Sequence, residues 1–228
     1  MYPAQSQLRG TEAAPGAADC LQGRALPRSP RLWSVPELVT ALSRRHRPVV
    51  TFLGYGELGY ACEASFEAIA RAELARVAKC DAIVNTGTLL TRGFRPGIAG
   101  VYPLAKDQGL STMGIHPSIA LAHADSHALA HGVDEIFFVH DPTWGGRSAH
   151  DQRLSHVLTA LIALSDEAVA IGGGKHTAME LEAFVQAGKP VRFHPAAMHL
   201  PTALAWYARK GEQAADAHGE AHRWWQAL

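Results

Sequence analysis

The sequence predicts an α/β fold in which helices cover both faces of a mostly parallel sheet. Six short runs are almost continuously apolar, as strands are when both of their faces are buried. Helical patterns separate each run from the next, and this alternation is typical of strands joined by crossover helices. Because such crossovers are right-handed, we expect a Rossmann-like, doubly wound parallel sheet of about six strands.

The individual elements follow in order along the chain. Pro36, shortly after Trp33, suits the first turn of a helix and predicts the first one. The apolar runs predict strands over residues 49–53, 82–85, 112–116, 135–140, 168–171 and 190–193. The helical patterns cover residues 36–45, 62–78, 98–107, 119–130, 151–164, 177–187 and 201–209, with a final helix within 211–228.

The composition is that of one globular domain. The chain has 228 residues, of which 47% are hydrophobic and 18% are charged, as in chains that bury a core. Residues 1–32 are rich in proline and have no helical or strand period, so they predict a flexible tail. We therefore expect a single domain over residues 33–228.

Charge and cysteine spacing exclude several classes of protein. Lys plus Arg and Asp plus Glu both total 21, so no basic field is available to attract nucleic acid. No apolar run reaches the ~18 residues that suggest a membrane span, and no secretory signal is visible. Cys20, Cys62 and Cys80 are widely spaced and odd in number, which fits no disulfide framework and no paired-cysteine metal site. We expect a cytoplasmic protein with no metal, membrane or nucleic-acid partner.

A glycine-rich loop follows the first predicted strand of the sheet. Gly54, Gly56 and Gly59 form a G-x-G-x-x-G pattern, which is typical of dinucleotide binding when an acidic residue ends the next strand. That strand ends instead in Asn85 and Thr86, so the pattern lacks the carboxylate for the ribose. A tight strand-to-helix turn also requires glycine and is the alternative interpretation.

Two further glycine loops are predicted at the same edge of the sheet. One contains Gly87 and opens a helix through Gly97 and Gly100. The other runs from Gly172 to Thr177; it is not a P-loop, because Val169 stands where the first glycine of that motif is required. Its backbone N–H groups and the Thr177 hydroxyl are expected to face an anion at the start of the helix.

Two motifs, in this order, resemble those of the LOG/SLOG superfamily. Gly97-Ile98-Ala99-Gly100 is similar to its G-[LI]-M-G loop, and Gly172–Glu180 is similar to its [PG]-G-G-x-G-T-x-x-E signature. The resemblance spans about residues 49–193. The superfamily includes phosphoribohydrolases, proteins mislabelled as lysine decarboxylases, and nucleotide-binding or carrier relatives.

The resemblance implies a ligand, a reaction and an assembly. Its hydrolases bind a nucleoside 5′-monophosphate and cleave the N-glycosidic bond, for which a carboxylate suits the developing oxocarbenium character at C1′. It implies a homodimer, with no cofactor, and a catalytic role for Glu180. Thr177 matches the threonine of the family signature. Together with the loops at the carboxyl edge of the sheet, the candidate ligand-binding residues are Gly54, Gly56, Thr86, Gly87, Gly97, Gly100, Arg147, Gly172, Gly173, Gly174, Lys175 and Thr177.

Two positions depart from the family pattern. His176 replaces the glycine before the threonine, which crowds the approach to phosphate, and the family arginine falls near Val157. Arg153, one turn earlier, or Arg147 is the expected substitute. These departures favour a non-catalytic sensor or carrier with the same fold, whereas Thr177 and Glu180 favour a hydrolase.

Three other features leave alternatives open. Thr177 and Glu180 also match a capping box, in which both side chains only satisfy helix-start N–H groups. Trp144 either offers an aromatic face to a base or pins its loop to the core. His123, His127 and His131 are spaced to lie on one helical face and could offer imidazoles to zinc. All three cannot share one ion, because i and i+8 lie about 12 Å apart along a helix axis, so a solvated or packed stripe is expected.

Overall fold

The structure, a computed structural model, describes residues 24–25, 27, 30–86, 90–91, 97–123, 127–148, 151–211 and 217–228. Most of the predicted tail, Gly87 and Cys20 lie outside the described residues. The chain joins the main sheet at Leu32, one residue before the predicted start of the domain.

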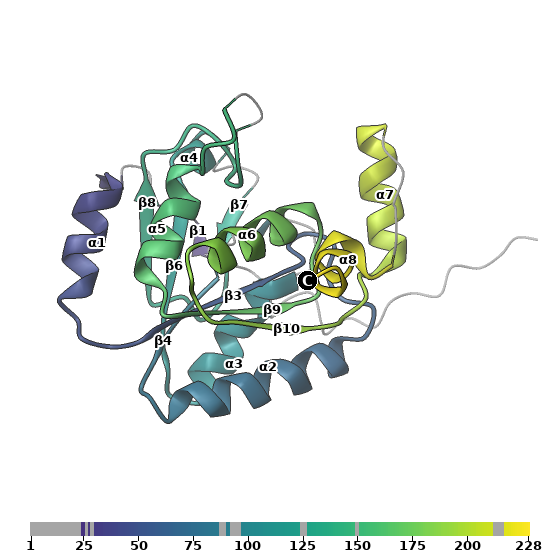
Figure 1. Ribbon diagram of the computed structural model, residues 1–228, viewed down its shortest axis with the longest axis horizontal. Helices are drawn as coiled ribbons and strands as arrows, with labels where there is room; N and C mark the ends of the chain where they lie inside the picture. Colours follow the sequence, from purple (N-terminus) through teal and green to yellow (C-terminus); the bar gives the residue numbers. More distant parts are fainter. Residues whose placement is uncertain are drawn as a thin grey trace, which may run out of the picture.

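The predicted α/β class is confirmed by a seven-stranded parallel sheet (Figure 1). The strands, in spatial order, are β10 (Val191–His194), β9 (Glu167–Ile171), β3 (Val49–Gly54), β4 (Ile83–Asn85), β6 (Ser111–Pro117), β8 (Glu135–Val139) and β2 (Leu32–Trp33). Six of them match the predicted strands. The seventh, β2, pairs in parallel with β8 over only two residues, too short a run to give a strand pattern.

A second, three-stranded antiparallel sheet corrects the predicted helix over residues 119–130. It consists of β1 (Arg24–Ala25), β7 (His127–Leu129) and β5 (Leu90–Thr91). Only the short helix α4 (Ile119–Ala122) forms in the predicted range. A short apolar run can form a helix or a strand, and residues 127–129 form a strand because they pair with β1 and β5. The predicted histidine stripe is therefore wrong, because His123, His127 and His131 do not share a helix.

Helices cover both faces of the main sheet (Figure 1). One face packs α1 (Val35–Ser43), α5 (His156–Leu164), α6 (Lys175–Gln186) and α8 (Gly219–Gln226). The other face packs α2 (Glu63–Ala78), the short 3₁₀ segment η2 (Gly97–Gly100), α3 (Val101–Asp107) and α7 (Leu200–Lys210). Each face has its own apolar cluster, so the sheet is buried on both sides as its continuous apolar strands predict.

Two predicted helix starts are shifted, for local reasons. The helix predicted over 151–164 begins at His156, because Ser155 caps α5 by accepting a hydrogen bond from the Leu158 N–H. The helix predicted over 177–187 begins two residues earlier, at Lys175. The first helix, α1, has a complete capping box between Ser34 and Glu37.

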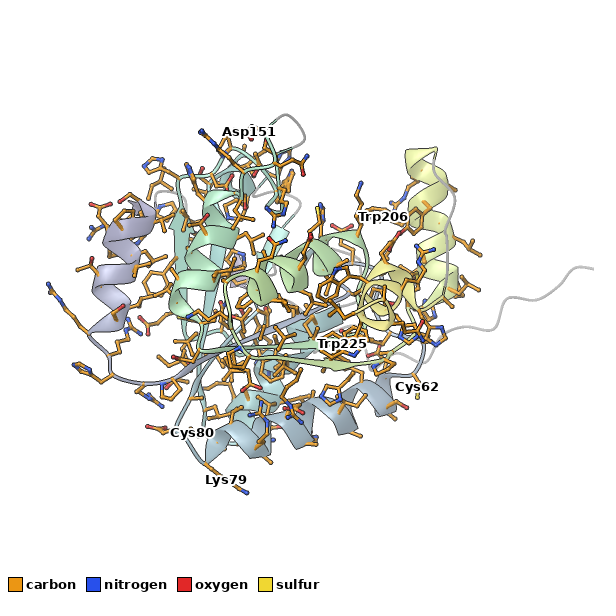
Figure 2. All side chains as sticks on the ribbon, viewed as in Figure 1. Cys62, Lys79, Cys80, Asp151, Trp206 and Trp225 are labelled. Atoms are coloured by element: carbon orange, nitrogen blue, oxygen red, sulfur yellow. The ribbon has the colours of Figure 1, made fainter. Side chains whose placement is uncertain are left out.

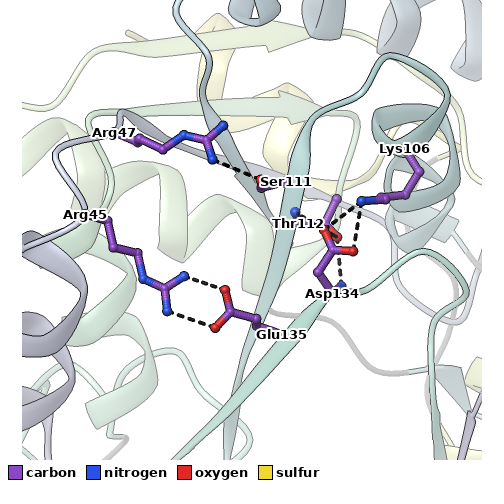
Figure 3. A network of polar contacts seen from close by, with 7 residues as sticks. All are labelled: Arg45, Arg47, Lys106, Ser111, Thr112, Asp134 and Glu135. Atoms are coloured by element: carbon purple, nitrogen blue, oxygen red, sulfur yellow. Dashed lines mark hydrogen bonds and ion pairs between the residues drawn. The ribbon is translucent and has the colours of Figure 1, made fainter.

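Polar contacts hold the amino ends of β6 and β8, at the edge of the sheet opposite the three predicted glycine loops (Figure 3). The Asp134 carboxylate accepts hydrogen bonds from Lys106 Nζ and from the Thr112 N–H at 2.9 Å each. Arg45, after α1, forms a two-bonded ion pair with Glu135 at the start of β8. These contacts join α1, α3, β6 and β8 at the amino ends of the strands.

The two described cysteines lie at opposite ends of α2 (Figure 2). Cys62 precedes the helix and Cys80 follows it, and both thiols are free and exposed. In the described part of the chain, no helix combines the length and the hydropathy that a membrane span requires.

Glu73 on α2 is the buried centre of an ion network. Its side chain is 5% exposed and accepts hydrogen bonds from Arg76 Nε at 2.7 Å and Arg192 Nε at 3.0 Å, with His194 Nε2 at 2.8 Å. Burial alone raises the pKa of Glu73, but these partners outweigh it and the pKa is lowered. The network ties α2 to β10, next to β9.

We expect Glu73→Gln to lower the free energy of unfolding by about 2 kcal/mol at pH 7, because it removes the charge that three partners share. Since the pKa of Glu73 is lowered in the folded state, this contribution is present above about pH 4.5 and is lost as the pH falls further. Denaturant unfolding measures it, with Glu67→Gln on the exposed face of α2 as control. Equal stability of the two variants would contradict the assignment.

Candidate functional site

The connection from β8 to β9 places the candidate site. The chain adds β4, β6 and β8 on one side of β3, and then returns to add β9 and β10 on the other. Ligands of doubly wound sheets bind at such a reversal, beyond the carboxyl ends of the strands. Here Gly54 at the end of β3 lies opposite Ile171 at the end of β9. The first and third predicted glycine loops are therefore neighbours.

A cavity of about 60 Å³ opens beside this point. Its walls come from the ends of β3, β4 and β6, from α5, from α6 and from the loop after β8. The described residues that line it are Leu53, Gly54, Thr86, Pro117, Trp144, Gly145, Gly146, Val157, Leu158, Leu161 and Glu180. Of the residues predicted to bind or react, Gly54, Thr86 and Glu180 are brought together.

Glu180 is the only acid among the described residues that line the cavity. It lies on α6 and is half-buried. Burial raises its pKa from 4.5 to about 7, and no hydrogen bond or ion pair to another described residue opposes this shift. A carboxyl group with a pKa near neutrality can both accept and donate a proton at physiological pH, as an acid–base catalyst must.

Thr177 links α6 to the end of β3 and does not cap α6. It is the third residue of the helix, and the N-cap is Gly174, which makes no side-chain capping bond. The buried Thr177 hydroxyl donates to the Gly54 carbonyl oxygen at 3.0 Å. The capping-box interpretation of Thr177 and Glu180 is therefore wrong, because the helix begins at Lys175 rather than at Thr177.

The loop after β8 forms one wall of the cavity through Trp144, Gly145 and Gly146. Asp141 is buried and accepts hydrogen bonds from the Val157 N–H of α5 and from the Thr143 N–H, both at 2.9 Å. These bonds hold the loop at the start of α5. Trp144 is 48% exposed at the cavity mouth, so it does not pin the loop to the core. Gly146 rests on α6, where a Cβ atom would approach Met179 Cε to 3.0 Å.

The described glycines of the second loop, Gly97 and Gly100, serve chain packing. A Cβ atom at Gly97 would overlap the carbonyl oxygens of Tyr55 and Gly56, and one at Gly100 would approach Phe66 to 3.0 Å. Buried Tyr55 and Tyr60 fill the turn after β3, and α2 begins only at Glu63. The G-x-G-x-x-G pattern is thus a strand-to-helix turn, and its glycines are not next to a helix N-terminus as a dinucleotide site requires.

The predicted cationic residues lie away from the cavity. The Arg153 side chain is 85% exposed and pairs with Asp151 on the same loop. The Arg147 guanidinium binds the Gln152 carbonyl oxygen and Gln186 Oε1, and it does not line the cavity. Lys175 is exposed. The described lining therefore contains no arginine or lysine.

The C-terminal helix α8 covers the third glycine loop. The sequence predicts a final helix but not this contact. The Ala221 N–H of α8 donates to the Gly173 carbonyl oxygen at 3.2 Å. Gly172 and Gly173 have φ values of +56° and +131°, and a Cβ atom at Gly172 would approach Ala196 O to 2.7 Å. The one feature of the sequence that could have indicated this contact is Gly219, a glycine within a predicted helix, where the missing Cβ permits close packing.

Comparisons with known proteins give distant structural likenesses. No protein-family model and no curated protein matches the chain. A molybdenum cofactor carrier protein from Chlamydomonas reinhardtii is 22% identical over 65% of this chain and 76% of that chain, with a TM-score of 0.46. A second structure of the Moco carrier protein from that organism is 21% identical over 80% and 100% of the two chains, with a TM-score of 0.44. The X-ray structure of TM1055 is 22% identical over 64% and 72%, with a TM-score of 0.45. At this distance the likenesses assign no family and no ligand, which are argued below from the site.

We expect Thr177→Val to lower the free energy of unfolding by about 1 kcal/mol, because it leaves the Gly54 carbonyl oxygen without its hydroxyl partner. Valine keeps the shape of threonine, so packing changes little. Thr177→Ser, which keeps the hydroxyl, is the control and should retain the hydrogen bond. Chemical denaturation compares the two; a valine variant as stable as the serine variant would refute the link between β3 and α6.

Proposed function

We propose that this chain binds a nucleotide or phosphoribosyl metabolite and hydrolyses the N-glycosidic bond of a nucleoside 5′-monophosphate. Glu180 carries the proposal: a half-buried carboxyl group that pairs with none of the described residues, with a pKa of about 7, lies in the cavity at the sheet reversal. The motif resemblance of residues 97–100 and 172–180 supports placing the chain in the LOG/SLOG superfamily. The two free, exposed thiols support a reducing, cytoplasmic location.

The proposed chemistry requires one acid–base group next to C1′ of the ribose. As the bond from C1′ to the base nitrogen breaks, its electron pair leaves with the base and C1′ gains oxocarbenium character. A carboxylate stabilises that charge, takes a proton from the water that attacks C1′, and then gives this proton to the departing base nitrogen. Glu180 would do this in its ionised form. Leu158 and Leu161 form an apolar wall that keeps the site poor in water and sustains the raised pKa.

Trp144 is the proposed platform for the base. Its indole ring is half exposed at the cavity mouth, and aromatic rings bind planar bases by stacking. A nucleotide is larger than the 60 Å³ cavity, so only its reacting end enters, and the base lies outside against Trp144.

A specific observation favours the alternative, a non-catalytic sensor or carrier of the same fold. No cationic side chain is among the described residues that line the cavity. The arginine expected from the family pattern is absent there, since Arg153 pairs with Asp151 in solvent. Loss of that group with retention of the pocket would leave a binding protein.

Glu180→Gln separates the two functions. If Glu180 is the catalytic base, release of free base and ribose 5-phosphate from AMP should fall by two to four orders of magnitude, roughly the contribution of a positioned acid–base group. Wild-type turnover should rise with pH up to about 7, because only the ionised carboxylate accepts a proton. Glu182→Gln, two residues along α6, is the control. Undiminished hydrolysis by Glu180→Gln would contradict the catalytic assignment of Glu180. If the wild type does not hydrolyse AMP, the non-catalytic sensor or carrier is the function that remains.

The same substitution should stabilise the fold. Because the folded-state pKa of Glu180 is raised, its stabilising contribution is complete below about pH 4.5 and is lost as the pH rises through 7. Glutamine stays neutral, so the free energy of unfolding of Glu180→Gln should exceed that of the wild type by about 1–3 kcal/mol at pH 8 and by little at pH 4. Urea unfolding at both pH values measures this. A difference that does not grow with pH would mean that the carboxyl group is not buried as described.

We further propose a homodimer, with α7 in its interface. The helix projects from the body of the molecule, and Trp206 lies on it (Figure 2). Leu200 and Leu204, one turn apart, are 46% and 53% exposed, and apolar side chains at the core of interfaces are typically covered by a partner. Sedimentation equilibrium at micromolar concentration should give about twice the chain mass of 24.4 kDa. A monomer would contradict the proposal, and Leu204→Glu should produce one.

A further inference from the structure

The C-terminal helix α8 occupies the space in front of the third glycine loop. Its Ala221 N–H is bonded to the Gly173 carbonyl oxygen. A Cβ atom at Gly219, the first residue of α8, would overlap that same carbonyl oxygen and would lie 2.9 Å from Tyr55 Oη. The backbones of α8 and the loop are therefore in direct contact at Gly173, and no ligand group fits between them there.

α8 also brings a negative charge to the start of α6. Glu220 Oε2 is buried, and a Cβ atom at Gly174, the N-cap of α6, would lie 3.6 Å from it. A helix N-terminus attracts anions because its first N–H groups are unpaired and its dipole is positive there. The Glu220 carboxylate thus lies where the phosphate of the proposed ligand is expected, at the helix start that follows Gly172–Gly174.

The docked helix α8 buries polar atoms that have no hydrogen-bond partner. Among the described residues, three buried side-chain polar atoms have no hydrogen-bond partner, and two of them, Glu220 Oε2 and His222 Nδ1, belong to α8. The other carboxylate oxygen of Glu220, Oε1, lies 3.8 Å from Arg223 Nη2 on the same helix, so this pair does not hold α8 to the loop. The two buried atoms lose their water without gaining a hydrogen bond, which weakens docking. Apolar contacts oppose this: Ala221 is fully buried, and Trp225 stacks on Phe193 at 5.4 Å. An eight-residue helix does not persist alone in water, so α8 is folded only while it is docked.

We propose that α8 is an autoinhibitory cover of the phosphate subsite, and that a phosphate monoester binds the Gly172–Gly174 loop by displacing α8 and replacing the Glu220 carboxylate. This inference rests on the proposed function, because it concerns the regulation of the same site. It reconciles the signature of the loop, which predicts an anion site, with the helix that fills the space in front of it. The covered state binds phosphate weakly, and the uncovered state binds it strongly.

The unmodified protein provides the first test, with ribose 5-phosphate as probe. Hydrogen exchange should be slow over α8 without the probe, because the Ala221 N–H is bonded to Gly173. Saturating ribose 5-phosphate should increase exchange over residues 219–226 at least tenfold, while ribose alone should not. Probe binding that leaves α8 equally protected would overturn the inference.

Gly219→Val tests the cover directly. The residue has φ +69° and lies against Gly173, so valine forces α8 off the loop. Gly211→Val is a matched control, because Gly211 has the same φ of +69° with no atom within 4 Å of an added Cβ. We expect ribose 5-phosphate to bind Gly219→Val at least tenfold more tightly than wild type by calorimetry, and Gly211→Val to bind as the wild type does.

Glu220→Gln keeps the test decisive if Gly219→Val fails to fold. It preserves the shape of the side chain and removes the competing charge, so the probe should bind at least threefold more tightly. Equal affinities in all folded variants and wild type would overturn the cover while leaving phosphate binding, and the proposed function, intact. No binding to any variant with α8 released would refute the phosphate subsite itself, and the inference with it. Tighter binding without hydrolysis of AMP would support the cover and refute only the catalytic assignment of Glu180.

Discussion

Close backbone contact at the junction of β3 and β9 is the constraint on which the rest of the site depends. At Gly54 a side chain would approach the Ile171 carbonyl oxygen to 2.7 Å, and at Gly173 it would approach Thr177 Oγ1 to 2.6 Å. Because both positions are glycine, the two strand ends meet and Thr177 can bond to the Gly54 carbonyl oxygen. This contact sets where α6 begins, and the start of α6 determines that Glu180, one turn after His176, faces the cavity.

The same close contacts explain what the sequence could predict and what it could not. Continuous apolar runs predict six strands of the main sheet, and three of the predicted site residues, Gly54, Thr86 and Glu180, line one cavity at the sheet reversal. Glycine spacing alone does not distinguish approach by a ligand from approach by the chain itself, since both need the missing Cβ. Gly97 and Gly172 accommodate backbone and the Tyr55 ring. The helix start at Lys175 and the strand at residues 127–129 depend on tertiary contacts that no local pattern contains.

Glu180, which is half-buried, differs from the two buried acids of the described chain. Glu73 and Asp141 are each held by hydrogen-bond donors from several elements, as buried carboxylates normally are. Glu180 has no such donor among the described residues, and burial raises its pKa, whereas the pKa of Glu73 is lowered. A fold under no other constraint would place an apolar residue there, beside Leu158 and Leu161. An ionisable group retained at the expense of stability is typical of a functional site.

The two unusual features of the site lie at the two ends of one short stretch of α6. Glu180 faces the cavity, and Gly174, six residues earlier, faces Glu220 of α8. A ligand that spans both would place its phosphate at the helix start and its glycosidic carbon near Glu180, so that occupation of one end by α8 also excludes productive binding at the other. Such a cover prevents Glu180 from acting on ligands that lack a phosphate, because only an anion can compete with Glu220 for the start of α6. The specificity for a phosphorylated ligand would then come from displacement of α8, and the chemistry from a carboxyl group that the fold leaves unpaired.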